Sequence, residues 1–246
     1  MLGSFNAALR LISHSVLASG MDKAMRAFIA LILVSVMPTI SIIFTYSWSE
    51  SELQGQIFFI FSKLWYIFIP VYWIYRIEES RLMLGEMNSN GRNESLISGI
   101  IIFVIIGVIF LMFGDTIDVE LMKKEIGPTG LLNLPLFITG MIYWITINSL
   151  IEEFVFRQFI GDRLLEITGR ESITVFLSAA IFTCHHTVLL SLYFEPWQNV
   201  IASLGVFIAG VTWSILWLRH RSLFVCWLSH AIADLAVFGI AYLILF

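Results

Sequence analysis

Residues 96–114, with the sequence LISGIIIFVIIGVIFLMFG, decide the fold class, because no charged side chain occurs among them. A spanning α-helix needs about 20 mostly apolar residues to cross the hydrocarbon core of a bilayer. The strands of a membrane barrel are much shorter and alternate between polar and apolar residues. This stretch therefore predicts a transmembrane helix rather than a barrel strand.

The rest of the chain has the same character. Its 246 residues are 59% hydrophobic and 13% charged, whereas a soluble domain averages about 45–50% apolar and about 25% charged residues. Six further apolar stretches are long enough to span a bilayer: 27–48, 56–75, 130–151, 172–194, 198–218 and 223–246. The sequence therefore predicts an all-α, polytopic transmembrane helix bundle of about seven spans.

The connections between these spans predict an orientation. Alternate connections place 11 lysines and arginines on one side of the membrane and two on the other. Because Lys and Arg are enriched in cytoplasmic loops, we expect the N-terminus in the cytoplasm and the C-terminus outside. Residues 1–20 are only mildly amphipathic, so we expect no cleavable signal peptide, and the first span would serve as its own insertion signal. The polar segment 76–95 is predicted to be a mobile cytoplasmic loop.

Two glutamates and an arginine follow the fourth apolar stretch. Glu153 and Arg157 are four residues apart, so they share one face if the helix continues, in the order that favours an ion pair. Glu152 lies about 100° further round such a helix, so the two carboxylates cannot play the same role. We expect Glu153 to pair with Arg157 and Glu152 to point into a cavity. The alternative is a polar cap where the helix leaves the membrane.

Three histidines lie deep within later stretches, where a polar side chain is either functional or hydrogen-bonded to a neighbouring helix. Adjacent side chains point about 100° apart, so only one of His185 and His186 is expected to share a cavity with a given partner. His230 and Asp234 are four residues apart, so the carboxylate can fix the tautomer of the imidazole. The alternative for this pair is a self-satisfied polar contact inside the bundle.

Lys63 interrupts the second apolar stretch. Its long side chain can carry the ammonium group to the membrane interface, or it can pair with an acidic residue. We expect one of these structural roles rather than a place in the chemistry.

Taken in order, the three polar motifs resemble the CAAX prenyl protease and bacteriocin-processing family, also called the Abi family, which includes the Ras-converting endopeptidases. The family pattern is Glu-Glu-x-x-x-Arg, then Phe-x-x-x-His, then His-x-x-x-Asn or Asp. The chain supplies Glu152, Glu153 and Arg157, then Phe182 and His186, then His230 and Asp234. The resemblance covers roughly residues 130–246, and Asp234 stands where the prenyl-protease branch usually has Asn.

The resemblance implies one integrated membrane domain, with N-terminal spans and a cytoplasmic loop in residues 1–125 and a catalytic core in residues 126–246. It implies an intramembrane endopeptidase that hydrolyses a peptide bond in a membrane-anchored peptide, either a prenylated CAAX peptide or a bacteriocin-like one. The expected partners are that peptide or protein and the lipid bilayer, with no nucleic acid. The expected location is the inner membrane of a bacterium or the endoplasmic reticulum membrane of a eukaryote.

The resemblance also implies a role for each motif residue. Glu152 and His186 would activate the water that attacks the scissile carbonyl, and Arg157 would hold Glu153. The cavity that contains them would be formed by the later helices.

His230 and Asp234 would lie across this cavity, where the family places a pair that stabilises the oxyanion. An ionised carboxylate only accepts hydrogen bonds, so we expect Asp234 to orient His230 and His230 to be the donor. The candidate catalytic residues are therefore Glu152, Glu153, Arg157, His186, His230 and Asp234.

No cofactor is expected, and zinc is the alternative. A glutamate and two histidines are suitable ligands for a catalytic zinc. However, the sequence contains no His-Glu-x-x-His, which is the spacing of many zinc proteases. We therefore favour a metal-free mechanism in which a glutamate and a histidine activate water.

Two other classes of protein stay open. One is a non-catalytic membrane scaffold or immunity protein with the same fold. The other is a proton-coupled transporter, because intramembrane carboxylates and histidines also form proton relays. Against the transporter, the sequence has no evident inverted repeat, and its polar residues gather in the C-terminal half.

Overall fold

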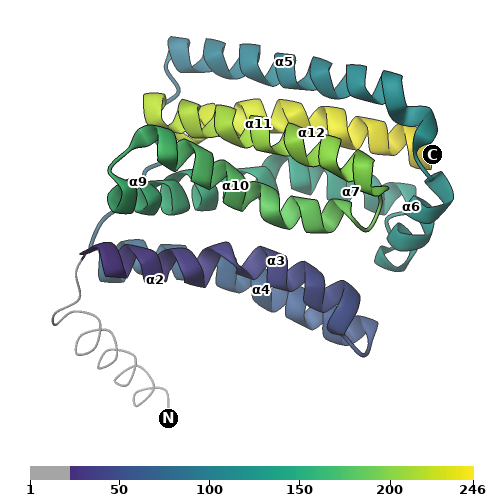
Figure 1. Cartoon of the computed structure of the whole chain (residues 1–246), viewed down its shortest axis with the longest axis horizontal. Helices are drawn as coiled ribbons and strands as arrows, with labels where there is room; N and C mark the ends of the chain where they lie inside the picture. Colours follow the sequence, from purple (N-terminus) through teal and green to yellow (C-terminus); the bar gives the residue numbers. More distant parts are fainter. Residues whose placement is uncertain (1–22) are drawn as a thin grey trace.

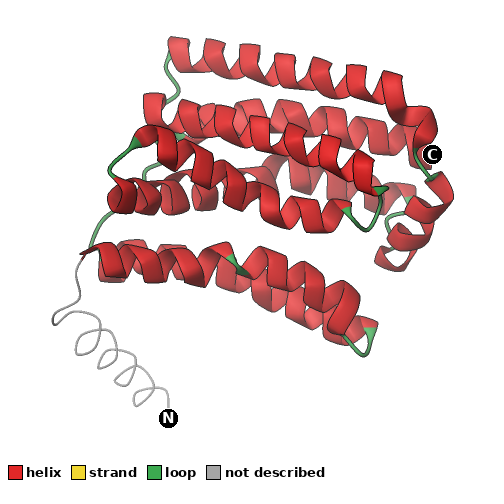
Figure 2. Cartoon of the chain, in the orientation of Figure 1, coloured by secondary structure: helices red, strands yellow, loops and turns green. Residues whose placement is uncertain are grey.

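A computed structural model of the chain describes residues 23–246, and the expectations about residues 1–20 lie outside that range. The described residues form helices and contain no strand (Figure 2). Seven helical segments among them are long and apolar enough to cross a membrane: Lys23–Trp48, Glu52–Ile77, Ser89–Thr116, Leu134–Thr168, Glu171–Leu190, Pro196–His220 and Leu223–Leu245. The predicted all-α transmembrane fold with seven spans is therefore confirmed, and the chain is an integral membrane protein.

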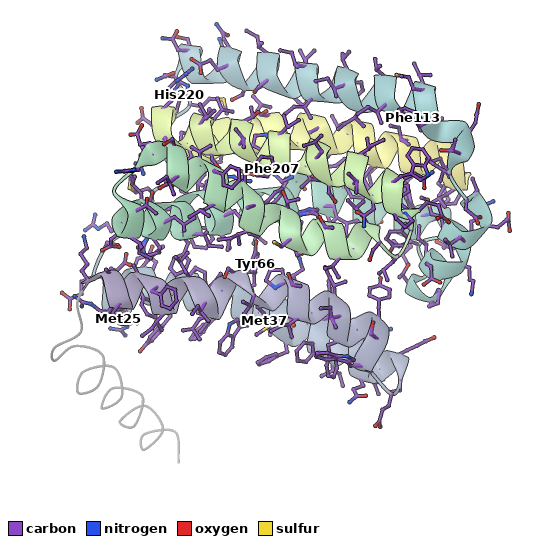
Figure 3. The ribbon with its side chains drawn as sticks, viewed as in Figure 1. Met25, Met37, Tyr66, Phe113, Phe207 and His220 are labelled. Atoms are coloured by element: carbon purple, nitrogen blue, oxygen red, sulfur yellow. The ribbon has the colours of Figure 1, made fainter. Side chains whose placement is uncertain are left out.

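The first two spans form a layer of their own (Figure 1). The first span consists of α2 (Lys23–Ser35), α3 (Met37–Ile43) and a π-helical turn, and the second consists of α4 (Glu52–Tyr72) and another π-helical turn. Side chains fill the space between this layer and the rest of the bundle, among them Tyr66, which is only 4% exposed (Figure 3). The layer therefore packs directly on the part of the chain that holds the polar motifs.

On the opposite side of the bundle, α5 (Ser89–Phe113) packs along α12 (Leu223–Leu245) (Figure 1). Small residues at four-residue intervals form the buried face of α5: Gly91, Ser95 and Gly99. Such a stripe lets two helices approach closely within a membrane. The Ser95 hydroxyl accordingly donates a hydrogen bond to the carbonyl oxygen of Val225 at 2.6 Å.

The fourth span is longer than the sequence suggested. It runs without a break through α7 (Leu134–Tyr143), a π-helical turn (Trp144–Asn148), α8 (Ser149–Glu153), a π-helical segment (Phe154–Gly161) and α9 (Asp162–Thr168). The apolar stretch predicted over 130–151 continues as helix, and all eight residues after Glu153 are buried against other helices. The two glutamates therefore lie near the middle of a continuous helical segment and are buried by other helices.

Two further helices complete the core. α10 (Glu171–Leu190) packs along α11 (Pro196–His220), and a Cβ on Gly210 would lie 3.2 Å from the Cα of Ala179. Outside the spans, α6 (Val119–Ile126) is a short amphipathic helix. Glycine thus allows close packing where α10 and α11 meet.

The polar segment after the second span is shorter than predicted and is anchored. α5 already begins at Ser89, where the Asn88 side chain accepts a hydrogen bond from the Gly91 N–H. The Leu84 carbonyl oxygen accepts a hydrogen bond from the Leu223 N–H at 2.9 Å. This segment is therefore held against the start of α12.

Candidate active site

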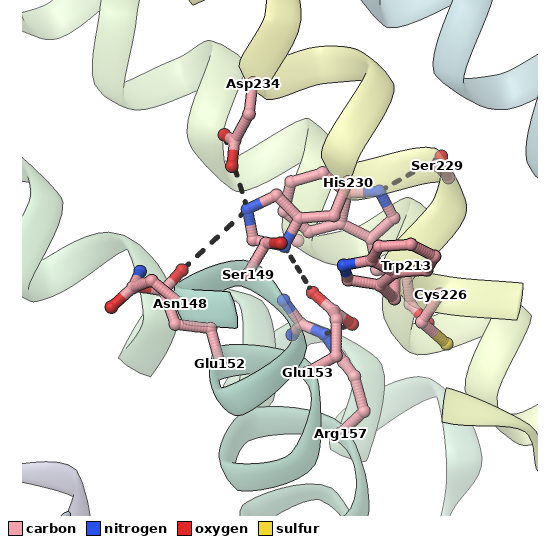
Figure 4. Close-up of polar contacts among 12 residues, drawn as sticks. Asn148, Ser149, Glu152, Glu153, Arg157, Trp213, Cys226, Ser229, His230 and Asp234 are labelled. Atoms are coloured by element: carbon pink, nitrogen blue, oxygen red, sulfur yellow. Dashed lines mark hydrogen bonds and ion pairs between the residues drawn. The ribbon is translucent and has the colours of Figure 1, made fainter. Parts of the chain in front are cut away.

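Glu153 is a fully buried carboxylate at the end of α8. Its Oε2 accepts a hydrogen bond from Nε of Arg157 at 3.0 Å, and its Oε1 accepts one from Nδ1 of His230 at 2.8 Å (Figure 4). The pairing with Arg157 agrees with the four-residue spacing. The contact with His230 joins α8 to α12, across 77 positions of sequence, so no local pattern could have indicated it.

Arg157 is 1% exposed and is enclosed by protein. Its guanidinium donates hydrogen bonds to Ser214 Oγ at 3.2 Å and to Ser178 Oγ at 3.4 Å. The ring of Phe182 lies 4.8 Å from the guanidinium carbon, within the range of a cation–π contact. Arg157 can therefore order the site through Glu153, but it has no open path to a substrate.

Glu152 faces a different direction, as its position on the helix predicts. Its Oε1 accepts a hydrogen bond from Nδ2 of Asn148 at 2.8 Å. Asn148 in turn accepts at Oδ1 from Nζ of Lys63 at 2.9 Å. The second oxygen of Glu152, Oε2, lies 3.8 Å from Nε2 of His230 (Figure 4). Glu152 thus keeps one oxygen without a direct hydrogen bond to protein.

Both histidines of α10 lie beside Glu152. One ligand atom from each of Glu152, His185 and His186 lies within 4.8 Å of the other two. The prediction that only one histidine could share a cavity with a given partner was wrong, because the two rings tilt toward each other, with centroids 4.1 Å apart. Rotation of the side chains thus brings the two imidazole rings together, although adjacent residues of a helix point about 100° apart.

Each of these two rings has a defined packing. Nδ1 of His186 donates to the carbonyl oxygen of Phe182 at 2.9 Å, since a carbonyl only accepts, and the neutral ring then has a free lone pair on Nε2. His185 stacks on Phe156, with centroids 5.3 Å apart and an interplanar angle of 8°. His186 can therefore accept a proton or a hydrogen bond at Nε2.

The side chains of Glu152, His185 and His186 together offer the donor atoms of a metal site. Catalytic zinc commonly has three protein ligands of the His and carboxylate type and one open position. A ring N–H donated to a backbone carbonyl, as at His186, is the usual way in which a ligating Nε2 is oriented. The residues Glu152, His185 and His186 therefore fit a divalent metal as well as a water molecule.

His230 is held from several sides. Its ring stacks on Trp213, with centroids 3.9 Å apart and an interplanar angle of 14°. Its Nε2 lies 3.6 Å from Oδ1 of Asp234, whereas the contact of Nδ1 with Glu153 is 2.8 Å (Figure 4). Asp234 is near His230, as expected, but Glu153 makes the shorter contact and is the stronger orienting group.

The six predicted catalytic residues are thus gathered in one cluster, from α8 and the helices around it. Sequence reasoning did not assign four of their neighbours to the site: Lys63, Asn148, His185 and Trp213. A signal did exist for Lys63, because an ionisable residue in the middle of a span is by default a functional candidate. Asn148 lies one helical turn before Glu152, which is a weaker signal.

Comparison with known proteins supports the family resemblance. Residues 134–236 match a family model described as type II CAAX prenyl endopeptidase Rce1-like. All six predicted catalytic residues fall within the match, and Lys63 falls outside it. No curated protein and no solved structure matches the chain.

Proposed function

Because residues 134–236 match the Rce1-like family model, we propose that the chain is a CAAX-type intramembrane endopeptidase of this family in which Glu152 is the general base. The family description itself supports activity of the CAAX protease class. The observation that carries the finer proposal is the free oxygen of Glu152, which lies 3.8 Å from His230. His186 lies within 4.8 Å of the same carboxylate.

The reaction begins with a water molecule between Glu152 and His186. Glu152 takes a proton from the water while His186 orients it, and the water oxygen forms a bond to the scissile carbonyl carbon. The carbonyl electron pair moves onto the oxygen, which becomes an oxyanion. When the C–N bond breaks, the proton on Glu152 passes to the leaving amine. Proton transfer of this kind typically contributes about 10²–10⁴ to a rate.

The oxyanion receives a hydrogen bond from Nε2–H of His230. Nδ1 of the same ring donates to Glu153, and the stacking on Trp213 fixes the plane of the ring. A preorganised donor at this place is typically worth about 10²–10³ in rate. Oδ1 of Asp234 lies 3.6 Å from Nε2 of His230. Before the substrate binds, this carboxylate is the acceptor that faces the Nε2–H group.

The substrate is a membrane-anchored peptide, because the reacting groups lie in the middle of the fourth span. A prenylated C-terminal CAAX peptide agrees with the family description. Such a peptide enters laterally from the bilayer, with its lipid chain among the apolar helix faces. An unprenylated, bacteriocin-like membrane peptide is the second candidate of the same class.

A metal-assisted version of the hydrolysis is the second mechanism, and the grouping of Glu152, His185 and His186 favours it specifically. There, a divalent metal held by these residues would act as a Lewis acid. In the metal-free mechanism, His185 packs on Phe156 and takes no part in proton transfer. The two mechanisms therefore differ in their dependence on His185.

The deciding experiment measures cleavage of a fluorogenic prenylated CAAX peptide by the purified protein in detergent. Glu152→Ala and His186→Ala are compared with wild type, with and without a strong chelator. Activity lost in both variants and unchanged by the chelator supports the metal-free mechanism. Activity lost in chelator and in His185→Ala supports the metal-assisted one. Full activity of Glu152→Ala contradicts both.

A further inference from the structure

Lys63 is a cation within the membrane that the family match does not include. It lies near the middle of the span Glu52–Ile77, where a charged side chain is costly and usually functional. Its ammonium lies 5.6 Å from the centre of the Phe59 ring and 5.9 Å from that of Tyr66. The ammonium also donates a hydrogen bond to Asn148 Oδ1, so it faces the bundle. Of the two expected roles, a reach to the membrane interface and a pairing with an acidic residue, the contacts resemble the second, with the amide of Asn148 between Lys63 and Glu152.

The hydrogen bond from Lys63 determines the orientation of Asn148. An ammonium group only donates, so the amide oxygen of Asn148 faces Lys63 at 2.9 Å. An ionised carboxylate only accepts, so the amide nitrogen faces Glu152 at 2.8 Å. A flip of the amide would lose both hydrogen bonds. Asn148 is thus locked in one orientation by charged groups on both sides.

This arrangement distinguishes the two oxygens of Glu152. Oε1 is bound to the amide, so Oε2 is the oxygen that remains available for a water molecule. The positive charge of Lys63 also offsets a crowded set of negative charges, because Glu153 and Asp234 both lie close to His230 beside Glu152. The amide keeps the ammonium from binding Glu152 directly, which would block that carboxylate.

We infer that Lys63 is a positioning residue for the proposed reaction, which acts on Glu152 through Asn148. It selects the carboxylate oxygen that faces the water, because the amide it holds binds the other oxygen. This inference rests on the proposed role of Glu152 as general base. It also assigns the N-terminal layer, which lies outside the family match, a direct part in the site.

The test uses the full-length protein and the prenylated CAAX peptide, with Lys63→Met, Asn148→Leu and the double variant. Displacement of a reacting group commonly costs about 100-fold in rate, so each single change is expected to lower kcat by about 10- to 100-fold while KM changes little. The double variant is expected to lose no more than the worse single variant, because both act through one contact. Lys63→Arg, which keeps charge and donor, is expected to recover part of the loss.

Lys23→Met is the matched control. Lys23 lies in the same layer and pairs with Glu166 at 3.0 Å, but its side chain is 78% exposed. This change removes a lysine without touching the site, so kcat is expected to stay at the wild-type value. A fall equal to that of Lys63→Met would mean that loss of any lysine in this layer is harmful, and it would overturn the inference.

Failure of the inference and failure of the proposed function are distinguishable. Wild-type kcat in Lys63→Met, with Glu152→Ala inactive, overturns the inference alone. Multiplied losses in the double variant overturn the path through Asn148. Full activity in Glu152→Ala overturns the proposed function.

A second measurement does not depend on activity. The infrared difference between wild type and Glu152→Gln identifies the band of the Glu152 carboxylate. Lys63→Met is expected to shift the frequency of this band, because the amide of Asn148 is no longer held toward Oε1 of Glu152, and Lys63→Arg is expected to retain it. An unchanged carboxylate band in Lys63→Met would overturn the inference even if no peptide is cleaved.

Discussion

Glu152 and Glu153 follow one another in α8, and their carboxylates meet different surroundings. Glu153 is fully buried, and both of its oxygens bind charged or ionisable side chains directly, those of Arg157 and His230. Glu152 has one oxygen bound to a neutral amide, with Lys63 one group further away. Two adjacent carboxylates thus differ in their free hydrogen-bonding capacity: both oxygens of Glu153 have direct partners, whereas Oε2 of Glu152 has no direct hydrogen bond to protein.

The largest expected effect is the loss of the free carboxylate. Glu152→Ala is expected to lower kcat by about 10²–10⁴, since it removes the general base. The melting temperature in detergent is expected to change little, because Glu152 accepts a single hydrogen bond from protein, from the neutral amide of Asn148. Peptide cleavage measures the expected fall in kcat, and a thermal melt of the same preparation measures the melting temperature. If Glu152→Ala lowers both the melting temperature and the activity, then Glu152, like Glu153, is needed for the stability of the fold.

The opposite pattern is expected for the buried ion pair. Arg157→Met removes one partner of a fully buried ion pair, which typically costs about 3–5 kcal/mol of stability. Arg219→Met is the matched control, because Arg219 pairs with Glu94 at 2.6 Å with its side chain 59% exposed. An exposed pair of this kind is worth about 0–1 kcal/mol.

Denaturation of the two arginine variants, side by side in the same detergent, measures this difference. Equal stability of Arg157→Met and Arg219→Met would contradict the structural role of Glu153. Activity is also expected to fall in Arg157→Met, for two reasons. Less of the protein is folded, and Glu153 no longer holds His230 in the same place.

A smaller effect is expected at His230, whose ring lies near the carboxylates of both Glu152 and Glu153. His230→Ala removes the proposed oxyanion donor and is expected to lower kcat by about 10²–10³, with little change in KM. A rise in KM with unchanged kcat would instead indicate that His230 binds the substrate in its ground state. Steady-state kinetics over a full range of peptide concentration separate these outcomes.

The smallest effect is expected at Asp234. Glu153 already orients His230 through the shorter contact, so Asp234→Asn is expected to keep kcat within about threefold of wild type, and it restores the residue usual in the prenyl-protease branch. Asp234→Ala removes the second support of the ring, and a fall in kcat of about 10-fold is expected, since a displaced donor loses most of its effect. Unchanged activity in Asp234→Ala would show that Asp234 does not orient His230.

Much of the site could be predicted from the sequence, because two of its residue pairs are separated by four positions, which is about one helical turn. The four-residue separation of Glu153 from Arg157 and of His230 from Asp234 follows from the helical repeat. The contact of Lys63 with Asn148 could not be predicted, although the mid-span position of Lys63 was visible, because the two residues lie 85 positions apart in the sequence. The tilt that brings His185 beside His186 depends on side-chain rotamers, which a helical wheel does not contain.

The all-α membrane fold and its seven spans follow from the amino-acid sequence alone, because a bilayer requires about 20 apolar residues for each helix and excludes unpaired backbone. The sequence also determined which polar motifs carry the family resemblance. Only the tertiary structure decided where the fourth span ends, because burial by other helices extends it past Glu153 to Thr168. Helix packing also determines that Glu153 binds His230 and that Asn148, beside Glu152, binds Lys63, because these contacts join residues 77 and 85 positions apart in the sequence.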